Sequence, residues 1–162
     1  SVSVEPPMFV DVVNVTSAAD MADVVKSKAA EQDIIIMTAA VADFCPSHPA
    51  DEKIKKNDSS YESVIELERT EDILSYLGAH KTKGQLICGF SMETQNMLEN
   101  SKAKLAKKNA DMIVANNLKV AGAGFGTDTN VVTLITADDC TELEIMDKSC
   151  VAARIMDRLL KM

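Results

Sequence analysis

The pattern of apolar and polar residues predicts strands and helices that alternate along the chain. Residues 9–15 are rich in β-branched side chains and predict a strand, while residues 33–38 form an apolar run typical of a strand buried on both faces. Between them, Thr16 and Ser17 predict the start of a helix, and apolar residues recur at helical spacing as far as Ala29. A strand, a helix and a second strand in this order predict a right-handed parallel crossover.

The same alternation continues to the C-terminus. Further strands are predicted at residues 64–67, 85–90 and 111–115, and a hairpin turn at Asp138 and Asp139 between strands at 131–136 and 143–146. Further helices are predicted from Thr70 to about Gly78, from Thr94 to about Asn109 and over residues 149–161. We expect one domain over residues 1–162, of the α/β class, with a three-layer Rossmann-like fold, a mainly parallel sheet and a C-terminal β-hairpin.

The composition narrows the function class. The 162 residues are 46% hydrophobic and carry a formal net charge of -8 with a pI of about 4.7, which is typical of a folded acidic domain. No apolar run approaches the length of a membrane-spanning helix, and an acidic chain is a poor nucleic-acid binder. The cysteines have no C-x-x-C spacing, so we expect reduced thiols, no protein-bound metal site and a cytoplasmic protein. No signal peptide is visible. Because the sequence also lacks an initiator Met, we expect a processed or excised piece of a protein.

Candidate ligand-binding residues lie where the predicted parallel strands end, since ligands of open α/β sheets bind beyond the carboxyl ends of the strands. Four segments meet this condition, at residues 39–44, 69–73, 90–94 and 116–117. Small residues from Ala39 to Ala42 would let a ligand approach the backbone closely. A tightly packed strand end is an equally good interpretation of that segment.

Lysine clusters add a possible phosphate site. Lys53, Lys55 and Lys56 lie in a long polar segment over residues 43–60, and Lys104 and Lys108 are spaced to share one helix face. Together they could hold a triphosphate, although each cluster by itself is also typical of a solvated surface. The glycines at 122, 124 and 126 predict a mobile loop, because their spacing is not that of a dinucleotide fingerprint, and no P-loop is present.

A set of motifs carries a resemblance to a known family. They read A-A-V-A-D-F at 39–44, K-I-K-K at 53–56, G-F-S-M-E-T at 89–94, K-K-N-A-D at 107–111, A-N-N at 115–117 and F-G-T-D-T-N at 125–130. In this order they resemble bacterial phosphopantothenate–cysteine ligases, the synthetase half of the bifunctional coenzyme A biosynthesis flavoproteins. The resemblance runs from about residue 9 to the C-terminus.

The resemblance implies an activity. Family members use CTP to activate the carboxylate of 4′-phosphopantothenate as an acyl-cytidylate, and the amine of cysteine then displaces CMP. It further implies Mg²⁺ bound with CTP, a homodimer, and a decarboxylase domain with FMN fused to this one in the parent protein. A non-catalytic nucleotide-binding module is the alternative. A nicotinamide-dependent oxidoreductase is a third possibility, against which the missing fingerprint counts.

The resemblance also implies roles for individual residues. It assigns Lys53 and Ala40 to catalysis, and it assigns to the nucleotide Ala39, Asp43, Lys53, Thr70, Glu71, Asp72, Ile73, Phe90, Lys104 and Lys108. One departure stands out: the first strand, the Gly-rich phosphate loop and the Asn-bearing segment of family members have no counterpart here. We therefore expect the chain to be N-terminally truncated relative to the family, with CTP binding surviving this better than full ligase activity.

Overall fold

The fold is built on a five-stranded sheet. The computed structural model describes residues 5–50, 52, 64–93, 96–117 and 126–162. In spatial order the strands are β1 (Ile34–Met37), β4 (Leu86–Glu93), β5 (Met112–Asn117), β7 (Val132–Ile135) and β8 (Cys140–Glu142). The pairings of β1 with β4 and of β4 with β5 are parallel, whereas β7 is antiparallel to both β5 and β8. Only β7 therefore runs against the other strands of this sheet.

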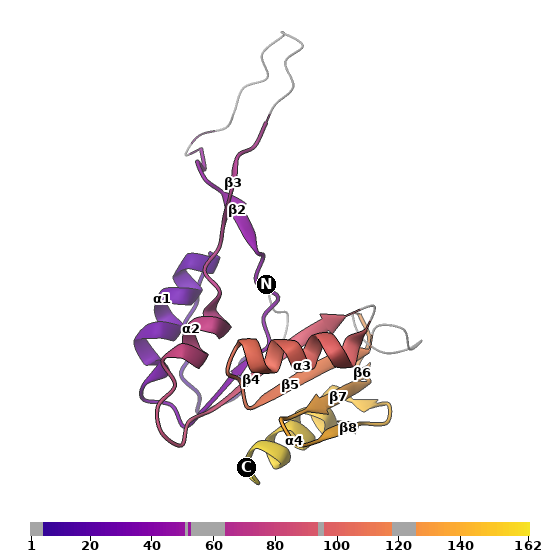
Figure 1. Ribbon diagram of the computed structural model, residues 1–162. Coiled ribbons are helices and arrows are strands. Elements are labelled where there is room, and N and C mark those ends of the chain that lie inside the picture. Colours follow the sequence, from indigo (N-terminus) through magenta and orange to yellow (C-terminus); the bar gives the residue numbers. More distant parts are fainter. Residues whose placement is uncertain (1–4, 51, 53–63, 94–95, 118–125) are drawn as a thin grey trace.

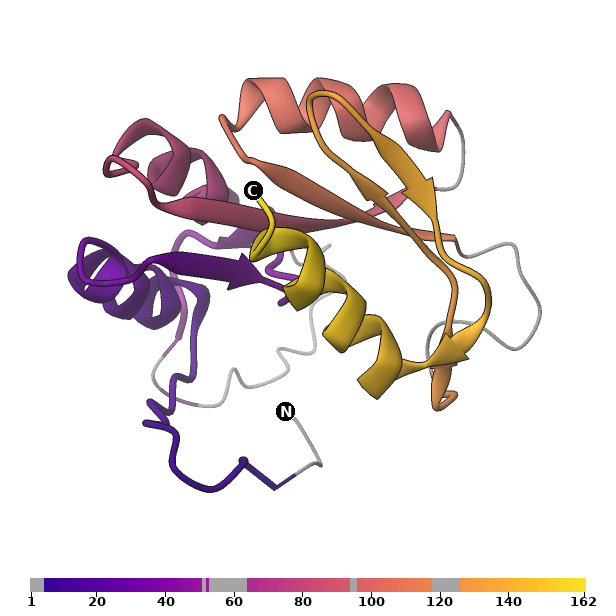
Figure 2. The same cartoon turned by 90° about the horizontal axis from the view of Figure 1, so that it is seen from below.

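Helices cover both faces of the sheet. On one face α1 (Ala18–Ala29) and α2 (Ile73–Ala79) bury Ala22 and Leu77 against Ile87 of β4. On the opposite face α4 (Lys148–Leu159) packs Ile155 against Cys88 and the other inward residues of β4, β5 and β7. A fourth helix, α3 (Met97–Lys107), lies across the sheet from α4 (Figure 2). The expected three-layer α/β fold with its C-terminal hairpin is confirmed.

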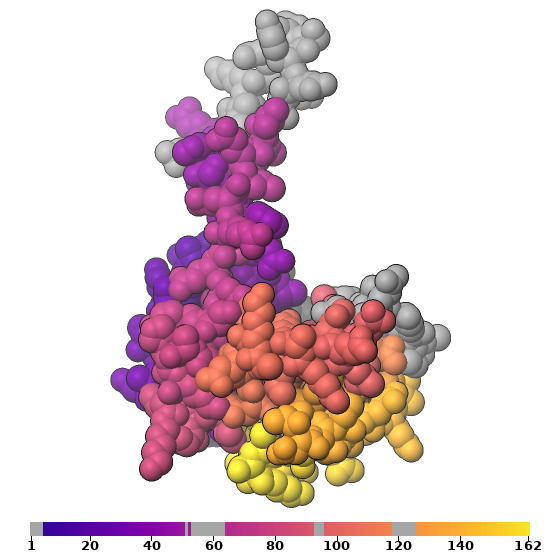
Figure 3. Space-filling view, viewed as in Figure 1, coloured from indigo at the N-terminus to yellow at the C-terminus, as the bar shows by residue number. Residues whose placement is uncertain are grey.

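Two short ribbons complete the molecule. The strands β2 (Phe44–Pro46) and β3 (Leu67–Arg69) pair antiparallel and project away from the sheet (Figures 1 and 3). The strands β6 (Thr129–Asn130) and β9 (Met146–Asp147) form a second antiparallel pair beside the start of α4. Within the part of the chain that the structure describes, no helix has both the length and the apolar character needed to cross a bilayer.

The central strands are buried on both faces, as their apolar runs predict. Ile87 and Cys88 are neighbours whose side chains point to opposite faces of β4, and neither is exposed at all. Burial raises the pKa of the Cys88 thiol to about 12, with the Asp111 carboxylate adding to the effect. Cys88 is therefore a small core residue rather than a reactive thiol.

The start of α1 follows its sequence signal. Ser17 is the N-cap and accepts a hydrogen bond from the backbone N–H of Asp20, whose carboxylate in turn accepts from the Ser17 N–H. The prediction for α2 is wrong by two residues, because Asp72 and not Thr70 caps that helix by accepting from the N–H of Ser75. Thr70 is engaged with the segment after β1 instead, and Thr94 lies outside the described residues.

Three strand predictions need correction. Residues 9–15 form no strand: they join no ladder in the described structure, and Phe9 is fully exposed. β-Branched residues favour an extended backbone, but a strand also needs a neighbour, and β1 pairs only with β4 among the described residues. The strand predicted at 64–67 begins later, at Leu67, and the second hairpin strand is residues 140–142 and not 143–146.

Candidate functional site

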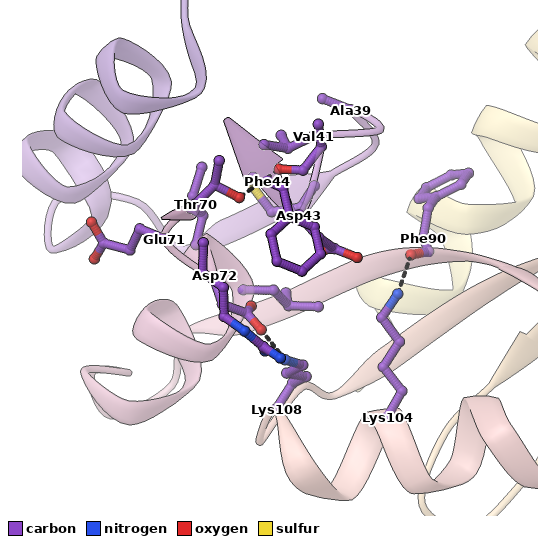
Figure 4. Close-up of a pocket in the computed structure, with 15 residues that line it drawn as sticks. Ala39, Val41, Asp43, Phe44, Thr70, Glu71, Asp72, Phe90, Lys104 and Lys108 are labelled. Atoms are coloured by element: carbon purple, nitrogen blue, oxygen red, sulfur yellow. Dashed lines mark hydrogen bonds and ion pairs between the residues drawn. The ribbon is translucent and has the colours of Figure 1, made fainter. Parts of the chain in front are cut away.

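A cavity of about 410 Å³ opens at the carboxyl end of β1, where Phe90 of the neighbouring strand β4 also lines it. Its walls come from the chain that follows β1, from the segment between β3 and α2, and from one face of α3 (Figure 4). This is the edge of the sheet where ligands of open α/β folds bind. It brings together residues that are far apart in sequence, with Met37 at one end of the range and Lys108 at the other.

Two hydrogen bonds join the segment after β1 to the segment after β3. The Thr70 hydroxyl donates to the carbonyl of Ala42 at 2.5 Å, and the Thr70 backbone N–H donates to the carbonyl of Asp43 at 3.0 Å. Phe44 pairs directly with Arg69 in the ribbon that begins there. The small residues from Ala39 to Ala42 thus form a backbone wall whose shape is held by a neighbouring segment.

Lys108 lies at the end of α3 and links this helix to α2. Its ammonium donates to the Asp72 carboxylate and, at 2.9 Å, to the Ser75 hydroxyl. Burial by itself would raise the pKa of Asp72, but the hydrogen bonds from Lys108 and from the Ser75 N–H outweigh it and hold the pKa below its ordinary value. Asp72 therefore stays ionised beside the cavity and fixes the position of the Lys108 ammonium.

Lys104 reaches the same cavity from one turn earlier on α3. Its ammonium donates to the backbone carbonyl of Phe90 at 3.1 Å, and it has no ion pair within the described residues. Figure 4 shows Lys104 and Lys108 both rising from α3 toward the cavity, as the i, i+4 spacing predicts. Lys102 and Lys107 of the same helix are exposed.

Glu71 and Arg69 complete the charged lining. The Glu71 carboxylate accepts a hydrogen bond of 2.6 Å from the ammonium of Lys26, which belongs to α1 and does not line the cavity. The Arg69 guanidinium lies over the ring of Phe44, 5.6 Å from its centroid. The cavity lining therefore has three carboxylates, Asp43, Glu71 and Asp72, and three cations, Arg69, Lys104 and Lys108.

The structure brings most of the predicted site residues to this one cavity. It is lined by Ala39, Asp43, Thr70, Glu71, Asp72, Ile73, Phe90, Lys104 and Lys108. Ala40 is exposed and is not part of the lining, although Ala39 and Val41 on either side of it both line the cavity. Lys53 and the rest of the K-I-K-K motif lie outside the described residues, as do the glycines at 122 and 124. The roles of all these residues stay predictions.

Sequence reasoning did not assign Phe44, Arg69 and Leu74, which also line the cavity. Phe44 and Arg69 lie inside two of the four segments selected at strand ends, so the sequence indicated the segments but not these two side chains. Leu74 follows a charged run and reads as an ordinary core residue of α2. Its contribution to the cavity depends on how α2 packs, which the sequence pattern does not show.

Comparison with known proteins agrees with the fold and with the motifs. The sequence matches the family described as DNA/pantothenate metabolism flavoprotein C-terminal domain over residues 1–162. It is 46% identical over 156 residues to the coenzyme A biosynthesis bifunctional protein CoaBC of Bacillus subtilis (strain 168), covering 96% of this chain and 38% of that protein. It is 45% identical over 152 residues to a cysteine/cysteine sulfinic acid decarboxylase of an unknown prokaryotic organism, covering 93% and 42% respectively.

A solved structure has the same fold. The crystal structure of the C-terminal domain of coenzyme A biosynthesis bifunctional protein CoaBC superposes with a TM-score of 0.79 at 40% identity, covering 100% of this chain and 72% of that one. The chain spans 38% and 42% of the length of the two curated relatives. The family match covers the whole sequence, and the chain belongs to the DNA/pantothenate metabolism flavoprotein C-terminal domain family.

Proposed function

We propose that this chain is a phosphopantothenate–cysteine ligase of coenzyme A biosynthesis, which joins 4′-phosphopantothenate to cysteine at the expense of CTP. Family membership and the 46% identity to a CoaBC protein support the proposal. One observation carries it: Lys104 and Lys108 line a cavity at the carboxyl end of β1, opposite the backbone of the A-A-V-A-D-F motif. A cavity with cations on one side and an accessible backbone on the other suits a nucleoside triphosphate.

The proposed chemistry has two steps. A carboxylate oxygen of 4′-phosphopantothenate attacks the α-phosphorus of CTP, an acyl-cytidylate forms and pyrophosphate leaves. The amine of cysteine then attacks the acyl carbon, CMP leaves with the bonding electrons, and the amine loses a proton as the amide forms. Neither step needs a protein nucleophile, so the enzyme contributes positioning and neutralisation of phosphate charge.

The lining residues suit these tasks. Lys104 and Lys108 would neutralise phosphate oxygens, and the backbone from Ala39 to Asp43 would contact the nucleotide. Ala40 and Lys53 keep the catalytic roles that the family resemblance implies, with Lys53 expected at the phosphates or in the coupling to cysteine. These assignments are part of the proposal.

Mg²⁺ fits the proposed site as a partner of CTP rather than as a resident ion. Among the described residues, no group of three or more His, Cys, Asp or Glu side chains could hold a metal by itself. Mg²⁺ normally binds through one or two carboxylates together with substrate phosphates and water. The Asp72 carboxylate forms an ion pair with Lys108 and the Glu71 carboxylate with Lys26, whereas Asp43 has no ion pair within the described structure. Asp43 would therefore hold the ion, which would neutralise charge on the triphosphate.

A binding assay followed by a turnover assay tests the function. Thermal shift with CTP, ATP and NADH should show stabilisation by CTP, because a ligand that binds only the folded state raises the melting temperature. The chain is then incubated with CTP, Mg²⁺, 4′-phosphopantothenate and cysteine, and released pyrophosphate and the amide product are measured. Product formation supports the ligase. CTP binding without product favours the nucleotide-binding module, and stabilisation by NADH instead would contradict both.

Assembly and location form a further part of the proposal. The printed name of the Bacillus subtilis relative describes a bifunctional protein, so we propose a parent protein that also carries an FMN-dependent decarboxylase domain. We propose that the chain forms a homodimer in the cytoplasm. Light scattering coupled to gel filtration measures the mass directly, and a monomer at micromolar concentration would contradict the dimer.

A further inference from the structure

Glu71 poses an electrostatic problem for the proposed function. It lines a cavity that is meant to hold a multiply charged anion, and a carboxylate at such a site repels phosphate. Asp72 poses no such problem, since Lys108 neutralises it from within the same cavity. The cation that neutralises Glu71 comes from outside, from a helix that contributes no residue to the lining.

That cation is Lys26 in the last turn of α1. Its ammonium lies 2.6 Å from Oε2 of Glu71 and 5.3 Å from the centroid of the Tyr76 ring, and Asp23 is a more distant partner at 3.9 Å. The hydrogen bond to Glu71 is the main cause that raises the pKa of Lys26 above its ordinary value. Lys26 is thus a lasting positive charge whose nearest acidic partner is Glu71.

The direction of the Glu71 side chain follows from this contact. Figure 4 shows the Glu71 carboxylate turned toward α1, on the opposite side from Asp43, Phe90 and Lys104. The side chain of Glu71 is 44% exposed, so it is not fixed in place by complete burial. The ion pair with Lys26 is what keeps this negative charge on the α1 side.

We propose that Lys26 is a positioning residue for the nucleotide cavity: its ammonium holds the Glu71 carboxylate away from the phosphates of the bound ligand. The inference rests on the proposed function, because it concerns how an anionic substrate is admitted to that site. Lys26 itself does not contact the ligand. It acts through Glu71, and removing Glu71 removes the need for it.

Four variants test the inference by calorimetric titration. Lys26→Gln breaks the ion pair, Glu71→Gln removes the carboxylate, and the double variant removes both. Lys28→Gln is the matched control, because Lys28 is an exposed lysine two positions along the same helix and its loss changes net charge equally. The probes are CTP, cytidine and inorganic tripolyphosphate. Thermal melting of each variant excludes loss of fold.

The expected pattern has three parts. Lys26→Gln weakens CTP and tripolyphosphate by roughly threefold to tenfold and leaves cytidine unchanged, because cytidine carries no phosphate. Lys28→Gln changes none of the three by more than about twofold. The double variant should bind CTP as Glu71→Gln does, so the loss of Lys26 has no effect once Glu71 is a glutamine, which a purely structural role of Lys26 would not produce.

Other outcomes overturn the inference. Equal losses in Lys26→Gln and Lys28→Gln would mean a general charge effect. Weaker CTP binding in the double variant than in Glu71→Gln would mean that Lys26 does not act through Glu71. If the unchanged chain binds tripolyphosphate but not CTP, the proposed function fails while the inference about Lys26 stays testable. The tripolyphosphate titrations of the four variants then decide the role of Lys26. Failure of the unchanged chain to bind either anion would overturn both.

Discussion

Lys108, at the end of α3, donates a hydrogen bond to Asp72, the N-cap residue of α2, across 36 positions of sequence. The side chain of Lys108 is only 13% exposed, whereas that of Asp72 is 51% exposed, so the pair joins a largely buried lysine to a carboxylate at the surface. Asp72 consequently has two tasks, since one of its oxygens caps α2 while the other holds a lysine at the cavity. Stability and ligand binding are therefore linked at this position.

The two lysines of α3 should discriminate ligands by phosphate charge. We predict that Lys104→Gln and Lys108→Gln each weaken CTP about tenfold or more and cytidine much less, since a charge-assisted contact contributes roughly 1.5–3 kcal/mol. Titration calorimetry with CTP, CMP and cytidine measures this, and added salt should reduce the difference. Lys107→Gln, an exposed site on the same helix, is the control. Equal effects on all three ligands would exclude a contact with the triphosphate.

Two different substitutions at Asp72 separate its role as the cap of α2 from its contact with Lys108. Asp72→Ala should lower the free energy of unfolding by about 1 kcal/mol because the cap is lost, whereas Asp72→Asn should cost less, since an Asn side chain can still accept from the Ser75 N–H. Both variants release Lys108. Urea unfolding compares their stabilities, and a larger loss in the Asn variant would contradict the capping role.

Asp43 is predicted to contribute to ligand binding and not to folding. Its side chain is exposed at the cavity, so Asp43→Ala should leave the melting temperature almost unchanged. The same variant should weaken CTP when Mg²⁺ is present, because it removes the carboxylate proposed to hold the ion. Calorimetry with and without Mg²⁺ makes the comparison. Equal CTP affinity with Mg²⁺ in both proteins would remove Asp43 from the site.

Gly78 is predicted to be intolerant of any side chain. A Cβ atom at this position would lie 1.8 Å from the carbonyl oxygen of Lys108, which is backbone and has little room to move. Gly78→Ala should therefore lower stability by more than about 2 kcal/mol. It should also weaken CTP by displacing Lys108. Gly89→Ala is the comparison, because its Cβ would meet the end of the Leu74 side chain at 2.6 Å and this side chain can rotate.

The capping carboxylate of α1 predicts a pH dependence. Hydrogen bonds from Thr16 and Ser17 lower the pKa of Asp20 from 3.8 to about 2. Because the folded state has the lower pKa, the ionised form stabilises it, and this contribution is complete above pH 4 and disappears as the pH falls toward 2. We predict that stability measured by urea unfolding declines less steeply over this interval in Asp20→Asn. Identical pH profiles would mean that the hydrogen bonds from Thr16 and Ser17 to the Asp20 carboxylate do not form in solution.

Much of the fold and part of the site follow from local patterns. The buried strands 85–90 and 111–115 and the start of α1 were predictable, because apolar runs and caps act over a few residues. The segments at 39–44 and 69–73 were predictable as well, since parallel strands present their carboxyl ends at one edge of a sheet. The failure at residues 9–15 has the opposite cause, because a strand depends on a neighbour that may come from any part of a chain.

The sequence by itself determined the order of elements, the family motifs and the charges available to the cavity. Only the tertiary structure decided which charges neutralise one another. Lys108 with Asp72 and Lys26 with Glu71 are pairs separated by 36 and 45 positions, and nothing local indicates either pairing. The physical reason is that an ion pair depends on distances of a few ångströms, which the packing of α1, α2 and α3 sets, whereas a sequence pattern records only the period of each helix.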